Sequence, residues 1–256
     1  MKVSVVTVVY NSERTISDCI DSVINQDYEN IEYIIIDGNS TDQTTEIIKS
    51  YQNKVERFVS EKDQGMYHAL NKGFKLATGE VIGLLHSDDI FADSHVISKI
   101  AHTFEDHNLH AVYGDLVYVN KGNTDQIIRY WKAGNYREGL FLYGWMPPHP
   151  TFYARKSVYD KFGYFNTQLE CAADYELLLR LIHKYKIKIH YLPEVLIRMR
   201  VGGQSNASLH NRLKAYAEDR QAWKMNQLKP HVYTSVLKPL RKILQFNFNN
   251  RRVNLA

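Results

Sequence analysis

Two adjacent carboxylates, Asp88 and Asp89, follow directly on an apolar run in the segment GLLHSDDIF (83–91). Neighbouring carboxylates repel each other, and packing alone does not call for them. A hard divalent cation takes oxygen ligands and is often shared with substrate phosphates, so it would offset this repulsion. The alternative is a cap on a helix that begins near Asp93 or Ser94, although a cap needs only one acidic residue. We predict a cation site at Asp88 and Asp89.

The elements that must position these carboxylates alternate between two patterns in the first half of the chain. Four short, apolar, β-branched runs are typical of strands buried on both faces: 3–9, 31–37, 55–60 and 80–86. Three segments with helical spacing lie between them, near 14–26, 42–52 and 65–77. This alternation predicts an α/β fold with a mostly parallel central sheet and helices on both faces.

Each of the four predicted strands is followed by a polar cluster: YNSERT, DGNSTD, EKDQG and HSDD. Ligands of such sheets bind outside the carboxyl ends of the strands, so we expect all four clusters to line one edge. In the second cluster, Ser40, Thr41 or Asp42 can cap the following helix. Asp37 instead ends a strand before that helix begins, which makes it a candidate ligand residue.

The pattern changes in the second half of the chain. Residues 111–119 and 127–131 alternate like paired antiparallel strands, and a helix is expected at 174–185. A Pro-rich loop, a strand and a short helix are expected between these elements. The C-terminal part has a helical pattern, with breaks expected at Pro230 and Pro239.

Composition is that of an ordinary globular protein, with 44% apolar and 23% charged residues. The 256 residues allow one substantial core, or one core with a smaller lobe. Cys19 and Cys171 are too few for a disulfide framework or a cysteine zinc site, which indicates a reducing, cytoplasmic compartment. No apolar run approaches the ~20 residues needed to cross a bilayer, so any membrane contact is expected from the side.

Charge is unevenly distributed along the chain. The net charge is +4, but ten basic and two acidic residues from position 206 onward give the tail +8 and leave −4 for the rest. Residues 232–248 add Val, Leu, Ile and Phe to this charge, as a helix on the inner face of the cytoplasmic membrane would. The alternatives are packing on the body or on a second subunit in a homodimer. Nucleic acid is not expected, because no recognised motif accompanies the charge.

Two long segments carry a resemblance to a known family. No GxGxxG follows the first strand and no GxxxxGK[ST] occurs, which disfavours dinucleotide dehydrogenases and P-loop enzymes. VSVVTVVYNSERTISDCIDSVINQDYENIEYIIIDGNSTDQT (3–44) and EKDQGMYHALNKGFKLATGEVIGLLHSDD (61–89) resemble the N-terminal half of family 2 glycosyltransferases with the GT-A fold. The resemblance spans roughly residues 1–205 and implies an inverting enzyme of the bacterial surface-polysaccharide type.

The resemblance implies a set of nucleotide-binding residues at the predicted edge. Residues implied to hold the base and ribose, or to lie near them, are Thr7, Val9, Tyr10, Asp37, Asp63, Asn71, Lys72 and Ser87. Lys72 has an alternative as a solvated helix residue. The Asp-x-Asp element of the family falls on His86-Ser87-Asp88, so Asp88 is the implied metal ligand, supported by Asp89. His86 replaces the usual first Asp; it either hydrogen-bonds a ribose or joins the metal shell.

The implied catalytic base is Asp174, in ECAADYELLLRLIHKY. An inverting sugar transfer needs a base to take the proton of the acceptor hydroxyl. Similar enzymes often carry this base as the second acid of a pair, but here Ala173 precedes Asp174 and Glu170 is farther back. The alternative is a helix-start charge worth only ~0.3–1 kcal/mol.

Two further segments resemble the acceptor region and a donor-closing loop of the family. Trp145 and His149 are expected to line an acceptor pocket, and the alternative for PPHP is a rigid turn. In RMRVGGQSN (198–206), the glycines permit a hinge, and Arg200 or Gln204 is expected to reach phosphate. The alternative there is a plain Gly-rich linker.

These patterns predict a nucleotide-sugar-binding half (1–115), an acceptor-binding half of the same GT-A domain (116–206) and a basic helical tail (207–256). The predicted function is Mn²⁺- or Mg²⁺-dependent, inverting transfer of a hexosyl or N-acetylhexosaminyl group from a UDP-sugar to a saccharide or lipid-linked saccharide in surface-polysaccharide biosynthesis. One alternative is a catalytically silent nucleotide-sugar-binding or scaffold protein. The other is a nucleotidyltransferase, which needs a basic triphosphate loop where YNSERT offers only Arg14.

Overall fold

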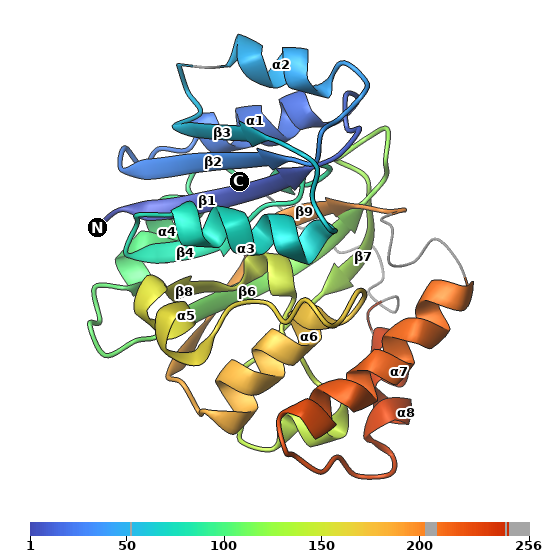
Figure 1. Cartoon of the computed structure of the whole chain (residues 1–256). Helices are drawn as coiled ribbons and strands as arrows, with labels where there is room; N and C mark the ends of the chain where they lie inside the picture. The colour runs from blue at the N-terminus through green and yellow to red at the C-terminus, as the bar shows by residue number, and fades with distance from the viewer. Residues whose placement is uncertain (52, 203–208, 244, 246–256) are drawn as a thin grey trace.

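The computed structural model describes residues 1–51, 53–202, 209–243 and 245. One twisted sheet runs through its centre (Figure 1). The strands are β1 (Val3–Val9), β2 (Ile31–Asp37), β3 (Arg57–Ser60), β4 (Val81–Leu84), β5 (Ile90–Phe91), β6 (Ala111–Val119), β7 (Ile127–Trp131), β8 (Tyr153–Arg155) and β9 (Ile189–Arg200). Their spatial order is β3-β2-β1-β4-β8-β6-β9-β5, with β7 paired to β6. The first four strands pair in parallel, as predicted.

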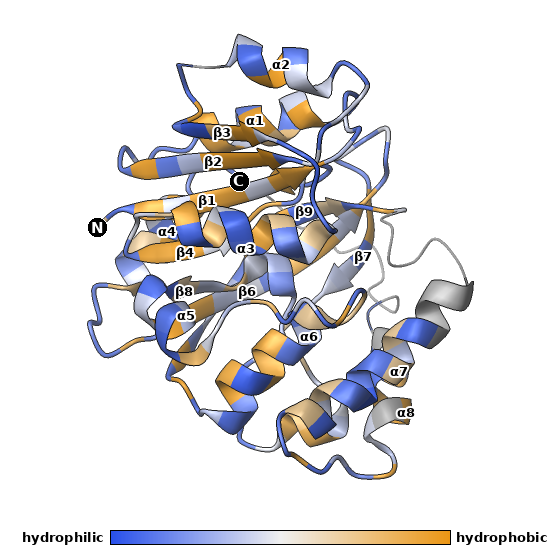
Figure 2. Cartoon of the chain, viewed as in Figure 1, coloured by the Kyte–Doolittle hydropathy of each residue, from blue (hydrophilic) through white to orange (hydrophobic). Residues whose placement is uncertain are grey.

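Helices cover both faces of this sheet, which confirms the predicted α/β fold. They are α1 (Ile16–Ile24), α2 (Thr44–Ser50), α3 (Met66–Leu76), α4 (Val96–Thr103), α5 (Lys156–Phe162), α6 (Ala173–Leu178), α7 (Leu209–Met225) and α8 (Thr234–Ile243). Side chains alternate along β1, so Val6 and Val8 join the core that includes α3, whereas Val5 and Val9 join the core that includes α1 and α4. β1 is therefore buried on both faces (Figure 2).

The second half makes the sheet mixed. β6 and β7 pair antiparallel, as predicted, and β8 runs antiparallel to both β4 and β6. A short 3₁₀ turn, η1 (Leu140–Tyr143), precedes the Pro-rich segment, which itself forms a second one, η2 (His149–Thr151), before β8 and α5. α6 continues as a π-helical turn, η3 (Leu179–Lys184), so the helix expected at 174–185 is present but not α-helical throughout.

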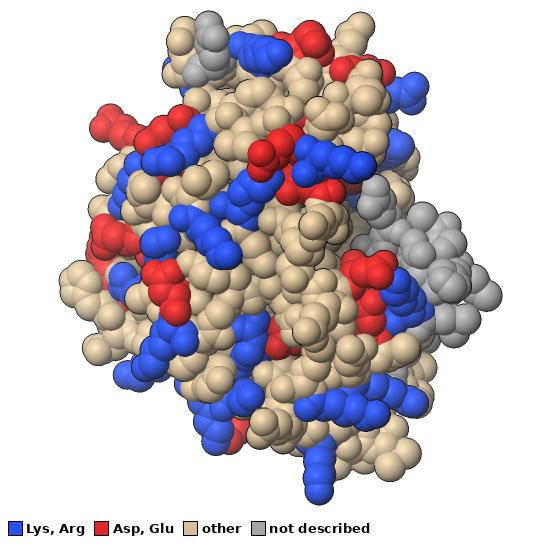
Figure 3. Space-filling model, in the orientation of Figure 1, with Lys and Arg blue, Asp and Glu red and all other residues tan. Residues whose placement is uncertain are grey.

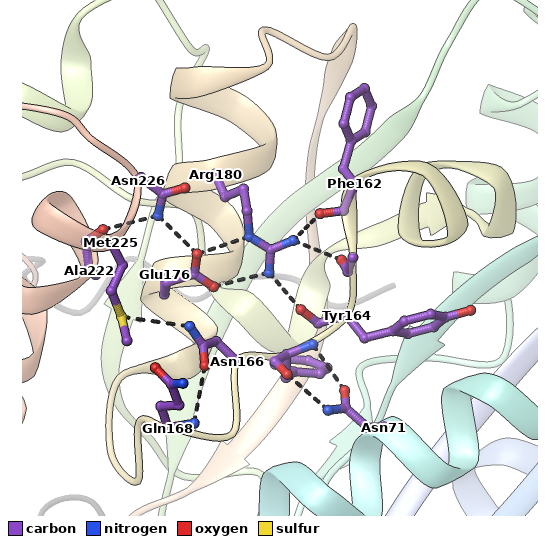
Figure 4. A network of polar contacts seen from close by, with 12 residues as sticks. Asn71, Phe162, Tyr164, Asn166, Gln168, Glu176, Arg180, Ala222, Met225 and Asn226 are labelled. Atoms are coloured by element: carbon purple, nitrogen blue, oxygen red, sulfur yellow. Dashed lines mark hydrogen bonds and ion pairs between the residues drawn. The ribbon is translucent and has the colours of Figure 1, made fainter.

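The tail helix α7 packs against α6. Trp223 is buried and its Nε1 donates to the Tyr175 hydroxyl at 2.9 Å. Figure 4 shows Asn226 reaching Glu176, which also pairs with Arg180; these contacts tie α7 to α6 and to the chain around Phe162. Of the alternatives for the tail, packing on the body therefore holds for α7.

Pro230 separates α7 from α8, as predicted, but the break expected at Pro239 was wrong because Pro239 lies inside α8. A proline removes one helical hydrogen bond. Contacts with the body offset that loss: Thr234 Oγ1 donates to the Leu142 carbonyl at 2.6 Å, and Arg241 Nε donates to the Tyr143 carbonyl at 3.0 Å.

The described helices include none that is both long enough and apolar enough to cross a bilayer. Basic side chains are prominent over the lower part of the face seen in Figure 3, where α7 and α8 lie in Figure 1.

Candidate active site

The loops after β1 and β2 are fixed to each other at the carboxyl edge of the sheet. The Asn11 N–H donates to Ser40 Oγ at 2.8 Å, and Asn11 Oδ1 accepts from the Thr41 N–H at 2.8 Å. Asn11 and Asn39 have φ values of 48° and 65°, in the left-handed region that Asn tolerates better than most residues. The rim of the site is thus ordered by the protein's own contacts.

Asp37 lies at this edge, as predicted, but its carboxylate is used within the protein. It is fully buried and accepts hydrogen bonds from the Ser40 N–H at 3.1 Å and from Ser60 Oγ at 2.6 Å. Tyr10 is 58% exposed beside Gly38 and offers an aromatic face at the rim. The geometry makes Asp37 the residue that shapes the loop and Tyr10 the residue that is open to a ligand.

Thr7 and Val9 do not present side chains to this edge, contrary to what the resemblance implied. Thr7 is fully buried, with its hydroxyl 3.1 Å from the Tyr33 hydroxyl. The Val9 side chain is buried as well, and its carbonyl accepts from the Gly38 N–H at 2.9 Å. Alternate residues of a strand point to opposite faces of the sheet, and Thr7 and Val9 both point to the face that packs against α1.

Asp63 and Lys72 meet at the edge, whereas Asn71 turns away from it. Asp63 Oδ1 accepts from Lys72 Nζ at 2.7 Å, and Lys72 also pairs with Glu61 at 2.5 Å, so Lys72 is not merely a solvated helix residue. Asp63 Oδ2 is buried and has no hydrogen-bond partner in the described part of the chain. Asn71 exchanges two hydrogen bonds with the Phe165 backbone (2.8 and 2.9 Å), which corrects its assignment to the nucleotide (Figure 4).

Asp88 and Asp89 point to different surroundings. Asp88 is half-buried and its carboxylate has no side-chain partner among the described residues, and burial raises its pKa. Asp89 is fully buried; Oδ1 accepts from the Arg200 N–H at 3.2 Å, and Oδ2 is unpartnered in the described structure. Burial, and then the Asp88 charge, raise the pKa of Asp89. Neither caps α4, because Asp93 accepts the His95 N–H there (2.7 Å), so the helix-cap alternative is wrong.

Arg200 is the last residue of β9, not part of a loop. Its guanidinium donates to the Asp88 carbonyl at 2.8 Å and pairs with Asp18 of α1. The side chain is 5% exposed, so it braces the backbone behind the Asp pair and does not extend toward solvent. Gln204, the other residue expected to reach phosphate, lies outside the described residues.

Three side chains from distant parts of the sequence lie in contact with one another. Asp174 Oδ2 lies 3.1 Å from His149 Nδ1, and His149 Nε2 is hydrogen-bonded to His86 Nε2 at 3.0 Å. Burial lowers the pKa of His149 and lowers that of His86 to about 3, so both imidazoles are neutral near pH 7. In the hydrogen bond between the two rings, one Nε2 donates and the other accepts, as the tautomers of the two rings decide.

Tyr67 completes the surroundings of Asp174. Its hydroxyl donates to Asp174 Oδ1 at 3.2 Å, and its ring stacks on Phe165 at 5.6 Å between centroids. Sequence reasoning missed Tyr67 because its spacing on α3 marks it only as an apolar position. It also missed Asp18, which pairs with Arg200. No local sequence pattern indicates the contacts of Tyr67 or Asp18 with these distant residues.

Trp145 and His149 were both expected to line an acceptor pocket, but their surroundings differ. His149 contacts Asp174 directly. Trp145 is 5% exposed, donates Nε1–H to the Ala133 carbonyl at 2.8 Å and packs against Tyr113 and Phe141. One edge of the Trp145 ring borders a separate pocket beside α8.

The residues present fit a divalent cation shared with a diphosphate. No group of three or more His, Cys, Asp or Glu side chains converges on one point within the described residues, so the protein alone does not enclose a metal. Mg²⁺ and Mn²⁺ are commonly held by one or two carboxylates and completed by substrate phosphates and water. Asp88, whose carboxylate has no side-chain hydrogen bond or ion pair among the described residues, suits that arrangement. Ser87 Oγ lies 3.1 Å from Ser12 Oγ, next to the same rim.

Comparisons with known proteins agree with this architecture. Residues 4–163 match the family model described as Glycosyl transferase family 2. A curated relative is the PGL/p-HBAD biosynthesis glycosyltransferase of Mycobacterium bovis, 25% identical over 214 residues that cover 79% of this chain and 78% of the relative. Another is glycosyltransferase GlyG of Streptococcus pneumoniae, 30% identical over 52% of this chain and 44% of the relative.

Solved structures share the fold at low identity. S. aureus TarS 1–349 in complex with UDP-GlcNAc superposes with a TM-score of 0.68 at 20% identity, covering 97% of this chain and 68% of that one. The mannosyltransferase PcManGT from Pyrobaculum calidifontis, in complex with GDP-Man and Mn²⁺, gives a TM-score of 0.66 at 18% identity, covering 93% and 72%.

Proposed function

Because the chain belongs to glycosyl transferase family 2, we propose that it is a metal-dependent, inverting enzyme that uses a UDP-sugar as donor. The transferred group is a hexosyl or N-acetylhexosaminyl unit, and the acceptor is a hydroxyl of a saccharide or lipid-linked saccharide in surface-polysaccharide biosynthesis. One observation carries the proposal: a series of side-chain contacts runs from Asp174 through His149 to His86, two positions before Asp88. A carboxylate suited to a base and a carboxylate suited to a diphosphate-bound cation therefore face one site.

Asp174 takes the proton from the acceptor hydroxyl. The hydroxyl oxygen forms a bond to the anomeric carbon, and the bond from that carbon to the diphosphate oxygen breaks with its electron pair on the departing phosphate. Asp174 Oδ1 accepts a hydrogen bond from Tyr67 and Oδ2 lies 3.1 Å from His149 Nδ1, so both oxygens retain a lone pair for the acceptor hydroxyl. A positioned base of this kind contributes about 10²–10⁴-fold to the rate.

The donor lies along the strand ends on the opposite side of the reacting carbon. Asp63 Oδ2 accepts an N–H of the base, and Tyr10 packs on the nucleoside. A divalent cation, when bound at Asp88, offsets the charge that develops on the leaving diphosphate. Arg200 donates to the Asp88 carbonyl through its guanidinium and to the Asp89 carboxylate through its backbone N–H, which holds both residues in place.

The test is turnover of UDP-, GDP-, dTDP- and CMP-sugars with Mn²⁺ or Mg²⁺ and saccharide acceptors, followed by mass spectrometry and by NMR of the new linkage. We expect one UDP-sugar to be consumed only with metal, and an α-linked donor to give a β-linked product. Retention of the anomeric configuration would contradict the inverting mechanism. Nucleotide binding without hydrolysis or transfer of any donor would instead favour a catalytically silent protein.

We also propose that the outer side of α8 touches an anionic membrane surface. Val236 is 57% exposed and Leu240 is 48% exposed, while no acidic residue occurs after Asp219. An exposed apolar stripe with basic flanks suits anionic lipid. Sedimentation with vesicles of phosphatidylglycerol should deplete the protein, and a Val236→Ser/Leu240→Ser variant should remain in solution; equal sedimentation of the two would contradict the contact.

A further inference from the structure

A pocket of about 350 Å³ lies between β7, the chain around η1, and α8. Its lining comprises Tyr130, Trp131, Lys132, Gly134, Gly144, Trp145, Met146, Lys238, Arg241 and Gln245. None of these residues belongs to the donor-binding rim or to the series of contacts from Asp174 to His86. The pocket is therefore a second feature, built where the tail meets the acceptor half.

Its walls are held by close contacts between α8 and the chain after η1. Gly144 has a φ of 73°, and a Cβ there would lie 2.4 Å from the Lys238 backbone nitrogen, so only glycine allows this approach. Thr234 and Arg241 donate to carbonyls on either side of the same turn. Lys238 Nζ also pairs with Asp219 of α7 at 2.7 Å.

The lining combines cations with aromatic faces and contains no carboxylate. Lys238 is neutralised by Asp219, but Lys132 is exposed and forms no ion pair with a described residue. Arg241 uses Nε on the Tyr143 carbonyl, and its terminal nitrogens make no hydrogen bond within the described structure. A guanidinium and an ammonium beside two indole rings suit a saccharide that carries phosphate, because phosphate takes charge-assisted bonds and sugar C–H groups pack against aromatic rings.

Gln245 adds a hydrogen-bonding group to the same pocket. Its Oε1 is buried and has no partner in the described part of the chain. A buried oxygen of this kind gains a hydrogen bond when a hydroxyl donor enters. A sugar hydroxyl supplies such a donor.

Packing connects this pocket to the catalytic carboxylate. Trp145 packs edge-on against Phe141 at 5.4 Å, and Phe141 lies 6.1 Å from Tyr175, the residue after Asp174. Lys238 Nζ lies 3.7 Å from the centre of the Tyr175 ring. The pocket is therefore linked to Asp174 through three packed, buried rings.

We propose that this pocket binds the phosphate-bearing part of the acceptor, with the phosphate at Lys132 and Arg241 and a sugar ring against Trp131 and Trp145. The inference rests on the proposed transferase function and specifies its acceptor class as a phosphorylated saccharide. The phosphate belongs either to a lipid-linked sugar diphosphate or to a water-soluble phosphorylated glycan, and both present the same chemistry to the pocket.

The test measures binding of three probes to the full chain with UDP and Mn²⁺ in excess, so that the donor site is filled. The probes are methyl N-acetylglucosaminide, N-acetylglucosamine 1-phosphate, and N-acetylglucosamine linked to farnesyl diphosphate. We expect both phosphorylated probes to bind about tenfold or more tightly than the neutral glycoside, the gain of a charge-assisted bond. Tighter binding of the farnesyl probe assigns the lipid-linked source, and equal affinity of the two assigns the soluble one.

Two substitutions in the lining test whether the preference for phosphorylated probes arises in this pocket. Lys132→Gln and Arg241→Gln should each remove most of the preference for phosphate, whereas Lys49→Gln on exposed α2 should keep it. UDP affinity and acceptor-independent donor hydrolysis should be unchanged in all three, which separates failure of this inference from failure of the proposed function. Equal affinity for neutral and phosphorylated probes, or full retention of the preference in both pocket variants, would overturn the proposal. Lys132 is exposed, so its variant is expected to fold.

Discussion

Two buried carboxylates at opposite ends of the same sheet differ in how fully their oxygens are hydrogen-bonded. Glu32, near the amino end of β2, accepts hydrogen bonds from Ser4 Oγ and from the Thr78 N–H (2.7 Å) and hydroxyl (2.7 Å), and pairs with Lys2 at 3.4 Å. Asp89, just beyond the carboxyl end of β4, accepts one backbone N–H and leaves Oδ2 unpartnered in the described structure. Both are fully buried, so exposure does not explain the difference.

The electrostatic consequences are opposite as well. Burial acts against the charge of Glu32, but hydrogen bonds from Ser4 and Thr78 lower its pKa to about 2. Burial and the neighbouring Asp88 raise the pKa of Asp89. At the amino end the protein satisfies the charge of Glu32 with its own donors, whereas at the carboxyl end one oxygen of Asp89 has no partner in the described structure. Loss of a carboxylate should therefore lower activity at the carboxyl end of the sheet and lower stability at the amino end.

Replacement of the base should have the largest effect at the carboxyl end. Asp174→Asn keeps the hydrogen bond from Tyr67 but removes the proton acceptor, so kcat should fall about 10²–10⁴-fold with the UDP affinity unchanged. Steady-state kinetics with calorimetry measures both quantities. Glu29→Gln, on the exposed turn before β2, is the control. A kcat within about threefold of wild type would show that Asp174 is not the base.

Loss of the His149 side chain, which contacts Asp174, should have a smaller effect on kcat. His149→Ala frees Asp174 Oδ2 to move, and a misplacement of this kind costs about 10²-fold in kcat. His149→Asn places an amide N–H near the position of Nδ1 and should recover part of the rate. A residue that merely lines the acceptor pocket would instead raise the KM for the acceptor and leave kcat intact, so the kinetic split decides between the two roles.

At the amino end, Glu32→Gln should change stability and leave catalysis alone. The substitution removes a buried charge that five donors satisfy, and we expect the free energy of unfolding to fall by about 2 kcal/mol. Urea unfolding measures this difference at neutral pH. A drop in kcat at a temperature where both proteins are folded would show that the two ends are not separate.

The smallest expected effect is the pH dependence of that difference. The folded pKa of Glu32, about 2, lies below its ordinary 4.5, so its stabilisation is fully present above about 4.5 and is lost as pH falls toward about 2. The unfolding free energies of wild type and Glu32→Gln should therefore approach each other as the pH is lowered from about 5 to about 3. A constant difference over this range would contradict the assignment.

The sheet and its carboxyl edge could be predicted because their signals are local. Runs such as 3–9 and 31–37 are strands as predicted, since burial on both faces demands continuous apolar residues. Side-chain direction was harder: resemblance placed Thr7 at the nucleotide, but the alternation along β1 turns it into the core.

Contacts between distant segments could not be predicted from one sequence. His86 and His149 are 63 positions apart, and Tyr67 and Asp174 are 107 apart, so no local spacing relates them. Pro239 was expected to end a helix because proline lacks an N–H, yet docking of α8 on the chain around Gly144 outweighs that loss. Tertiary packing decided each of these cases.

We propose that Asp88 holds a cation shared with the donor diphosphate. Calorimetric titration of UDP, GDP, dTDP and CMP, each with and without Mn²⁺, into wild type and Asp88→Asn tests this assignment. UDP should bind wild type tightly only with Mn²⁺, and the variant should lose the dependence on metal while its fold is unchanged. Binding that ignores both the metal and the substitution would contradict it.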